Sequence, residues 1–142
     1  MSDGSRSVVS SGPTVDPAAI LIVEGYGHSR EGLTASLRTE GLAVENAAEY
    51  LEAIRKIRDG RFAVAIIDVD LAPSPSSELT GFDLARVFRA LHPASALILV
   101  TAECRPELRV EARRLHGCQL LEKPINPAEL RAMLRARETG VK

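Results

Sequence analysis

The feature that most constrains the fold is an alternation, repeated five times, between a short apolar run and a segment whose apolar residues have helical spacing. The apolar runs have the length and the branched side chains of buried strands, and they lie at residues 19–23, 42–44, 62–69, 96–100 and 119–121. Strands that are apolar throughout and alternate with helices belong to a parallel sheet covered on both faces. Because crossovers between parallel strands are right-handed, the sequence predicts an α/β protein with a doubly wound, five-stranded parallel sheet in a three-layer sandwich.

Capping residues and apolar spacing place the helices between these runs. The second helix is predicted over residues 47–58. Thr80 is a candidate N-cap for the third helix, and Asn126, followed by proline, is a candidate N-cap for the last. The apolar stripes predicted for the second and third helices are Leu51, Ile54 and Ile57, and Leu84, Val87, Phe88 and Leu91.

Length and composition favour one domain of an ordinary globular kind. The chain has 142 residues; the Ser/Gly-rich stretch 1–16 is predicted to be a disordered N-terminal arm, and residues 17–142 form the domain. A net charge of −1 and 4% aromatic residues argue against nucleic acid as a partner. The apolar runs are too short to cross a membrane, and the N-terminus lacks an apolar signal segment. With two isolated cysteines, Cys104 and Cys118, we expect a cytoplasmic protein without membrane association.

Polar side chains follow four of the predicted strands at the point where each strand ends. Glu24 ends the first strand, Asp68 the third with Asp70 two residues later, Thr101 the fourth and Lys123 the fifth. Each one alone has an ordinary explanation as a loop, capping or surface residue. The carboxyl ends of parallel strands meet at one edge of a sheet, where ligands bind in such folds. Packing does not readily explain four polar strand ends together, so we expect a functional site at this edge.

In order and spacing, these residues resemble the receiver domain of bacterial two-component response regulators. The resemblance runs from about residue 19 to residue 137. It implies a flavodoxin-like (βα)5 sandwich that acts in phosphorelay signal transduction and is not an enzyme. The segments that carry it are ILIVE at 20–24, AIIDVDL at 65–71, GFDL at 81–84, ILVTA at 98–102 and EKP at 122–124.

The resemblance also implies a role for each polar residue. Asp68 is the expected phosphoacceptor, receiving a phosphoryl group from a histidine kinase or a histidine phosphotransfer protein. Thr101 is expected to hydrogen-bond the phosphoryl group and Lys123 to neutralise its charge. Glu24, Asp68 and the backbone carbonyl of Asp70 are the expected ligands of Mg²⁺. This set suits phosphoryl transfer, which requires an in-line nucleophile and positive charge on the equatorial oxygens.

Three positions depart from the family pattern. Gly25 stands where the family places a second acid that binds the metal directly, so we expect weak Mg²⁺ binding. The loop from Asp68 to Gly81 is lengthened by the Pro/Ser-rich stretch 73–77. Leu120 replaces the aromatic residue that rotates on activation. No output domain follows residue 142, which fits either a stand-alone receiver or a fragment excised from a longer protein.

Two functional hypotheses remain open on the sequence. The first is a phospho-accepting switch, favoured because Asp68, Thr101 and Lys123 are all present. The second is a pseudo-receiver that binds partners without phosphorylation. The output protein is not identified, and a homodimer through the fourth and fifth helices is a further partner implied by the resemblance. No nucleotide-binding or serine-hydrolase motif supports an enzyme instead.

Overall fold

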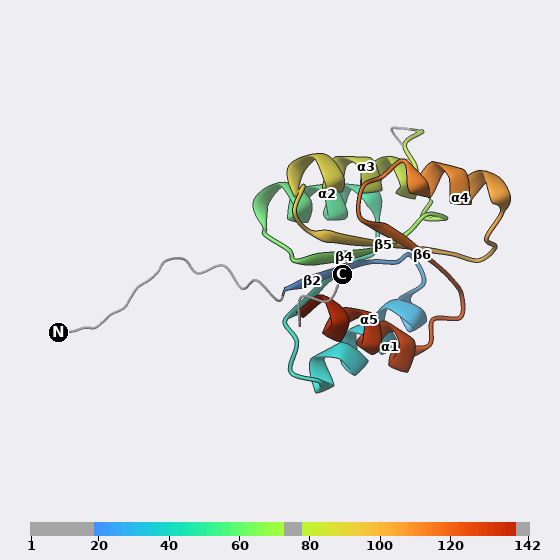
Figure 1. Cartoon of the computed structure of the whole chain (residues 1–142). Coiled ribbons are helices and arrows are strands. Elements are labelled where there is room, and N and C mark those ends of the chain that lie inside the picture. The colour runs from blue at the N-terminus through green and yellow to red at the C-terminus, as the bar shows by residue number, and fades with distance from the viewer. Residues whose placement is uncertain (1–18, 73–77, 139–142) are drawn as a thin grey trace.

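The computed structural model describes residues 19–72 and 78–138 and contains one five-stranded parallel sheet (Figure 1). The strand order is β3-β2-β4-β5-β6, and every pairing is parallel. This confirms the predicted doubly wound sheet. The elements in chain order are β2 (Ile20–Val23), α1 (Gly27–Thr39), β3 (Val44–Ala47), α2 (Tyr50–Asp59), β4 (Val64–Asp68), α3 (Gly81–Leu91), β5 (Ala96–Thr101), α4 (Pro106–Arg113), β6 (Cys118–Glu122) and α5 (Pro127–Glu138).

The sheet separates two helical layers, with α2, α3 and α4 on one face and α1 and α5 on the other (Figure 1). Successive side chains of a strand point to opposite faces. In β2, Leu21 and Val23 accordingly pack in the core beneath α2 and α3, while Ile20 and Ile22 pack in the core with α1 and α5. Each apolar strand therefore supplies both cores, which is why its sequence shows no polar alternation.

The register of the central strands brings their polar ends to one edge of the sheet. Val23, the last residue of β2, pairs with Ile67, so Glu24 and Asp68 follow at the same level. Asp68 pairs with Val100, which immediately precedes Thr101. Parallel pairing thus places three polar residues together although they lie far apart in the sequence.

Two predicted boundaries are wrong, and the pairing of β3 explains both. The second strand is Val44–Ala47 and not 42–44, because Val44 pairs with Ile20 at the start of β2. Residue 47 still belongs to the ladder, paired with Val23, so α2 begins at Tyr50 and not at 47.

Two residues of the predicted apolar stripes are exposed. Leu51 is 45% exposed, since α2 buries Tyr50 and Ala53 together with the predicted Ile57. Leu91 is 54% exposed at the last position of α3. The two predicted N-caps are confirmed: the Thr80 hydroxyl accepts from the N–H of Asp83 in a capping box, and the Asn126 side chain accepts from the N–H groups of residues 128 and 129.

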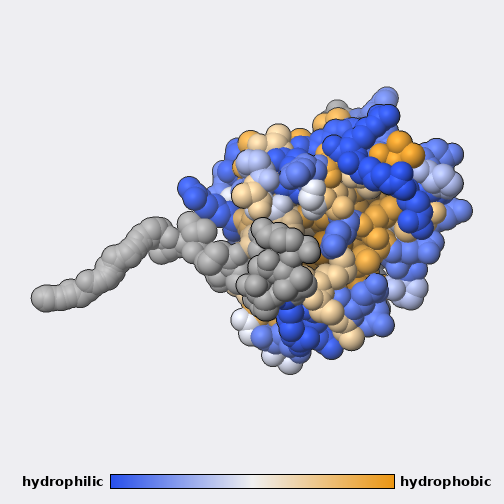
Figure 2. Space-filling model, in the orientation of Figure 1, coloured by the Kyte–Doolittle hydropathy of each residue, from blue (hydrophilic) through white to orange (hydrophobic). Residues whose placement is uncertain are grey.

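In the view of Figure 2, hydrophilic side chains cover much of the helical layers, and apolar side chains reach the surface between them. A groove of about 930 Å³ lies at the amino ends of β5 and β6, away from the polar strand ends. Within the described part of the chain, no helix is both long and apolar enough to cross a membrane. The predicted arm at 1–16 and the insertion at 73–77 lie outside the described residues.

The start of α3 packs directly on the backbone at the end of β4. A Cβ atom built on Gly81 would overlap the carbonyl oxygen of Asp68 and lie 2.9 Å from the Cα of Val69. Real Cβ atoms do not approach backbone this closely, so only glycine fits here without a shift of the segment that carries Asp68. A Cβ atom built on Gly32, in the middle of α1, would have no neighbouring atom within 4 Å.

These two glycines give opposite predictions for alanine substitution. We expect Gly81→Ala to lower the free energy of unfolding by about 1–3 kcal/mol, because the methyl group must displace backbone. Gly32→Ala is the matched control and should raise it by about 0.5–1 kcal/mol, because alanine restricts the unfolded chain and favours helix. Urea denaturation of both variants measures the difference. Equal effects of the two substitutions would contradict the close approach at Gly81.

Candidate functional site

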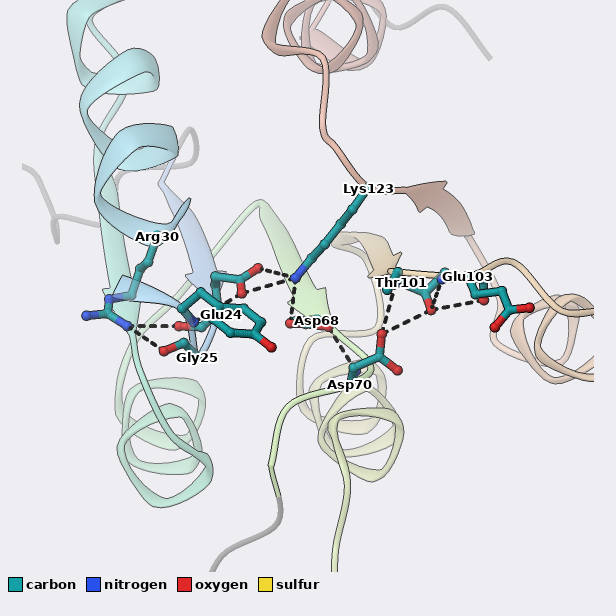
Figure 3. Close-up of polar contacts among 10 residues, drawn as sticks. Glu24, Gly25, Arg30, Asp68, Asp70, Thr101, Glu103 and Lys123 are labelled. Atoms are coloured by element: carbon teal, nitrogen blue, oxygen red, sulfur yellow. Dashed lines mark hydrogen bonds and ion pairs between the residues drawn. The ribbon is translucent and has the colours of Figure 1, made fainter. Parts of the chain in front are cut away.

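The structure brings together all five residues that the sequence singled out. Glu24 follows β2, Asp68 ends β4, Thr101 ends β5 and Lys123 follows β6, while Asp70 lies in the turn after β4 (Figure 3). Glu24, Asp68 and Thr101 are 5%, 3% and 0% exposed. The predicted gathering of polar residues at the carboxyl edge of the sheet is therefore present, with Glu24, Asp68 and Thr101 buried and Asp70 exposed.

Lys123 joins the two buried carboxylates. Its Nζ lies 2.9 Å from Asp68 Oδ2 and 3.1 Å from each of the two Oε atoms of Glu24. The ring of Tyr26 covers the ammonium group, with its centroid 5.2 Å from Nζ. Buried carboxylates are costly unless paired. Lys123 provides this pairing, and its side chain remains 21% exposed toward solvent.

The environment of the cluster raises the pKa of both the acid Glu24 and the base Lys123, for different reasons. Burial raises the pKa of Glu24 above its ordinary value, and the nearby charge of Asp68 adds to this effect, against the hydrogen bond from Lys123. Burial alone would lower the pKa of Lys123, but its hydrogen bonds to Asp68 and Glu24 outweigh burial and raise it. Lys123 is therefore a firmly protonated cation at neutral pH, held beside an acid that resists ionisation.

The side chain of Asp70 was not anticipated from the sequence, which indicated only its backbone carbonyl. Its Oδ2 accepts hydrogen bonds from the N–H of Ala102 at 2.9 Å and from the hydroxyl of Thr101 at 3.2 Å. Its own N–H donates to Asp68 Oδ1 at 2.8 Å. Asp70 thus connects the ends of β4 and β5 (Figure 3).

Arg30 is a second residue that sequence reasoning missed. Its Nη1 donates to the backbone carbonyl of Glu24 at 3.0 Å, which fastens the loop after β2 to α1. The adjacent Gly25 contributes no side chain, but the space beside it is open. A Cβ atom there would meet Leu71 Cδ1 at 3.7 Å and the carbonyl oxygen of Ala48 at 3.9 Å, both ordinary van der Waals contacts. A Cβ atom at position 25 therefore fits without displacing its neighbours.

The donor set suits a hard divalent cation that keeps some of its waters. Glu24 and Asp68 offer carboxylate oxygens, and Asp70 offers a carbonyl; oxygen donors of this kind are those that Mg²⁺ prefers. Among residues 19–72 and 78–138, no group of three or more His, Cys, Asp or Glu side chains is arranged to hold a metal ion. The available ligands therefore fit Mg²⁺ in kind.

The comparison with known families decides the identity of this fold. The sequence model of the response regulator receiver domain matches residues 20–135. The chain belongs to this family. Receiver domains are signalling domains of two-component systems, and they generally bind a divalent metal at the phosphorylation site.

Individual relatives agree with the assignment. The transcriptional regulatory protein CreB of Escherichia coli is 30% identical over 123 residues, which cover 87% of this chain and 52% of CreB. The chain thus spans about half the length of such relatives. Among solved structures, a CheY-like receiver domain protein from Methanospirillum hungatei has a TM-score of 0.73 at 28% identity, covering 86% of this chain and 97% of that one. Chemotaxis response regulator CheY4 of Vibrio cholerae has a TM-score of 0.72 at 30% identity, with 86% and 98% covered.

Because the pKa of Glu24 is raised, the receiver domain should be stabilised by neutralising this residue. A group whose pKa is raised in the folded protein stabilises the fold at pH values below its ordinary pKa, here 4.5. This stabilisation is lost as the pH rises through the raised pKa. We expect Glu24→Gln in metal-free buffer to increase the free energy of unfolding at pH 7 by on the order of 1 kcal/mol. The difference should shrink as pH falls below 4.5.

The exposed acid Glu31 of α1 provides the control for this measurement. Glu31→Gln removes the same charge at the surface and should leave the free energy of unfolding within about 0.5 kcal/mol of the wild type. Urea denaturation at pH 7 and at a pH below 4.5, in the presence of a chelator, compares the variants. A Glu24→Gln variant less stable than the wild type at pH 7 would show that the ionised carboxylate is a net stabilising group.

Proposed function

We propose that this receiver domain accepts a phosphoryl group on Asp68 from a phosphohistidine of a histidine kinase or histidine phosphotransfer protein. The observation that carries the proposal is the buried Asp68 carboxylate paired with Lys123 at 2.9 Å, at the edge of the sheet where Thr101 also ends its strand. Membership of the receiver family supports the same assignment.

The transfer requires little covalent chemistry from the protein. A carboxylate oxygen of Asp68 attacks phosphorus, the new P–O bond forms, and the P–N bond to the donor imidazole breaks. The electron pair of that bond stays on the imidazole nitrogen, which takes up a proton. Lys123, already adjacent to Asp68, can move its ammonium from the carboxylate to a phosphoryl oxygen, and the Thr101 hydroxyl can donate to another.

The proposed ligands of Mg²⁺ are Glu24, Asp68 and the backbone carbonyl of Asp70. When bound, the ion would offset the negative charge that gathers between the phosphoryl donor and the carboxylates. Gly25 removes one carboxylate from this set, so we propose that binding is weak. The proposal includes a cytoplasmic location, an output protein yet to be identified and a homodimer through α4 and α5.

A pseudo-receiver that acts without phosphorylation is the second candidate. One specific observation favours it, the absence of a side chain at Gly25 next to Glu24. The proposed metal site therefore has one carboxylate fewer than the family pattern. The presence of Asp68, Thr101 and Lys123 in one cluster favours the phospho-accepting function over it.

Asp68 is predicted to be the site of phosphorylation. Incubation with acetyl phosphate and Mg²⁺ should add the mass of one phosphoryl group to the wild-type protein, and Asp68→Asn should abolish this addition. Asp59→Asn, which alters an exposed aspartate at the end of α2, is the control and should be modified like the wild type. Intact-protein mass spectrometry measures the shift. An unmodified wild-type protein at saturating Mg²⁺ would instead favour the pseudo-receiver.

Restoring an acid at position 25 should strengthen metal binding. A Cβ atom fits at position 25, and a further carboxylate ligand there should tighten Mg²⁺ binding by about tenfold or more and accelerate phosphorylation. Gly25→Asn has nearly the same size without the charge and controls for the effect of the side chain itself. Isothermal titration with Mg²⁺ compares the three proteins. Equal affinity in Gly25→Asp and Gly25→Asn would indicate that position 25 does not contact the metal.

A further inference from the structure

We infer that the carboxylate of Asp70 competes with a phosphoryl group on Asp68 for two hydrogen-bond donors, the hydroxyl of Thr101 and the N–H of Ala102. The inference rests on the proposed function, because it presupposes a phosphoryl group on Asp68. It assigns to the side chain of Asp70 a positioning role that is separate from any use of its backbone carbonyl as a metal ligand.

The geometry places one anion on two donors at the end of β5. Asp70 Oδ2 lies 2.9 Å from the N–H nitrogen of Ala102 and 3.2 Å from the Thr101 hydroxyl. The N–H of the same residue donates to Asp68 Oδ1 at 2.8 Å. Asp70 therefore touches the proposed nucleophile with its backbone and the proposed phosphoryl-binding threonine with its side chain, and Figure 3 shows it between the two.

The Thr101 hydroxyl has a single proton to donate. Two acceptors lie within its reach, Asp70 Oδ2 at 3.2 Å and the backbone carbonyl of Glu103 at 3.1 Å. Hydrogen bonds to an ionised acceptor are stronger than those to a neutral one, which favours the carboxylate. Thr101 is fully buried, so water has little access to its side chain. In the unphosphorylated protein the hydroxyl is thus largely committed to Asp70.

A phosphoryl group on Asp68 is itself an anion, and in this proposal it takes up the two donors that Asp70 holds. Its negative charge and that of the Asp70 carboxylate repel each other, so Asp70 must release Thr101 and Ala102 before the phosphoryl group can bind them. Release is feasible because Asp70 lies at the exposed end of the cluster, where its carboxylate can turn into water. Until then, Asp70 keeps the segment at Thr101 and Ala102 drawn toward the end of β4, as a bound phosphoryl group would.

The test compares the wild type with Asp70→Ala, Asp70→Asn and a charge control, Glu103→Gln. Glu103 is exposed in the neighbouring loop, and its contacts with Thr101 are made by its backbone, so Gln removes one nearby charge without removing an acceptor from Thr101. Two quantities are measured at saturating Mg²⁺, with metal affinity determined separately for each protein. They are the affinity for beryllofluoride as a phosphoryl mimic and the amide proton shift of Ala102 without the mimic.

Asp70→Ala should bind beryllofluoride about tenfold more tightly than the wild type, the effect of losing one charge-assisted competitor. The Ala102 amide signal of the free variant should move upfield, because its acceptor is gone, and return downfield when the mimic binds. Asp70→Asn should retain most of the Ala102 shift, since an amide oxygen still accepts, and gain less affinity. Glu103→Gln should resemble the wild type in both quantities.

Three results would overturn the inference. An Ala102 amide signal that is the same in the wild type and Asp70→Ala would show that the carboxylate does not hold this donor. Equal or weaker beryllofluoride binding by Asp70→Ala would show that it does not compete. Failure of all four proteins to bind the mimic at saturating Mg²⁺ would contradict the proposed function of Asp68 and, with it, the competition. Binding by the wild type without tighter binding by Asp70→Ala would contradict the competition alone.

Discussion

The ammonium group of Lys123 makes the acidic edge of the sheet compatible with folding. Two carboxylates, from Glu24 and Asp68, are nearly fully buried at adjacent strand ends, and each is in contact with Nζ. Without that cation they would repel each other in a poorly solvated site. The same contact keeps a positive charge beside Asp68, where charge would develop during phosphoryl transfer. One interaction therefore serves the stability of the free protein and the proposed chemistry.

Much of the cluster could be predicted from the sequence because parallel pairing is a strong geometric constraint. Once the strands ending at Glu24, Asp68 and Thr101 are identified as neighbours, their polar ends must lie at one edge. The buried stripe of α2 was less predictable. Leu51 is more apolar than Ala53, yet α2 buries Tyr50, Ala53 and Ile57 as one face and leaves Leu51 outside it.

The side-chain contacts of Asp70 and Arg30 illustrate what sequence reasoning could not reach. Asp70 lies in the turn after β4, where the direction of a side chain depends on the local backbone, and Arg30 lies in the first turns of α1 and reaches back to the loop before it. The contacts of Asp70 are with Thr101 and Ala102, 31 and 32 residues away, so they depend on the final packing of β4 against β5. The only sequence signal was an acid two residues after the strand end, which does not by itself indicate the direction of its carboxylate.

The close approach at Gly81 has a consequence for how this domain can vary. The N–H of Leu71 donates to the carbonyl of Asp68 at 3.1 Å, and Gly81 packs against that same carbonyl. Both ends of the β4–α3 connection are thus anchored on one backbone group, and the capping box at Thr80 fixes the direction in which the helix departs. Loop-closure entropy grows only slowly with length, by about 0.6 kcal/mol per doubling. The connection can therefore lengthen or change composition over evolutionary time while the geometry around Asp68 is inherited intact.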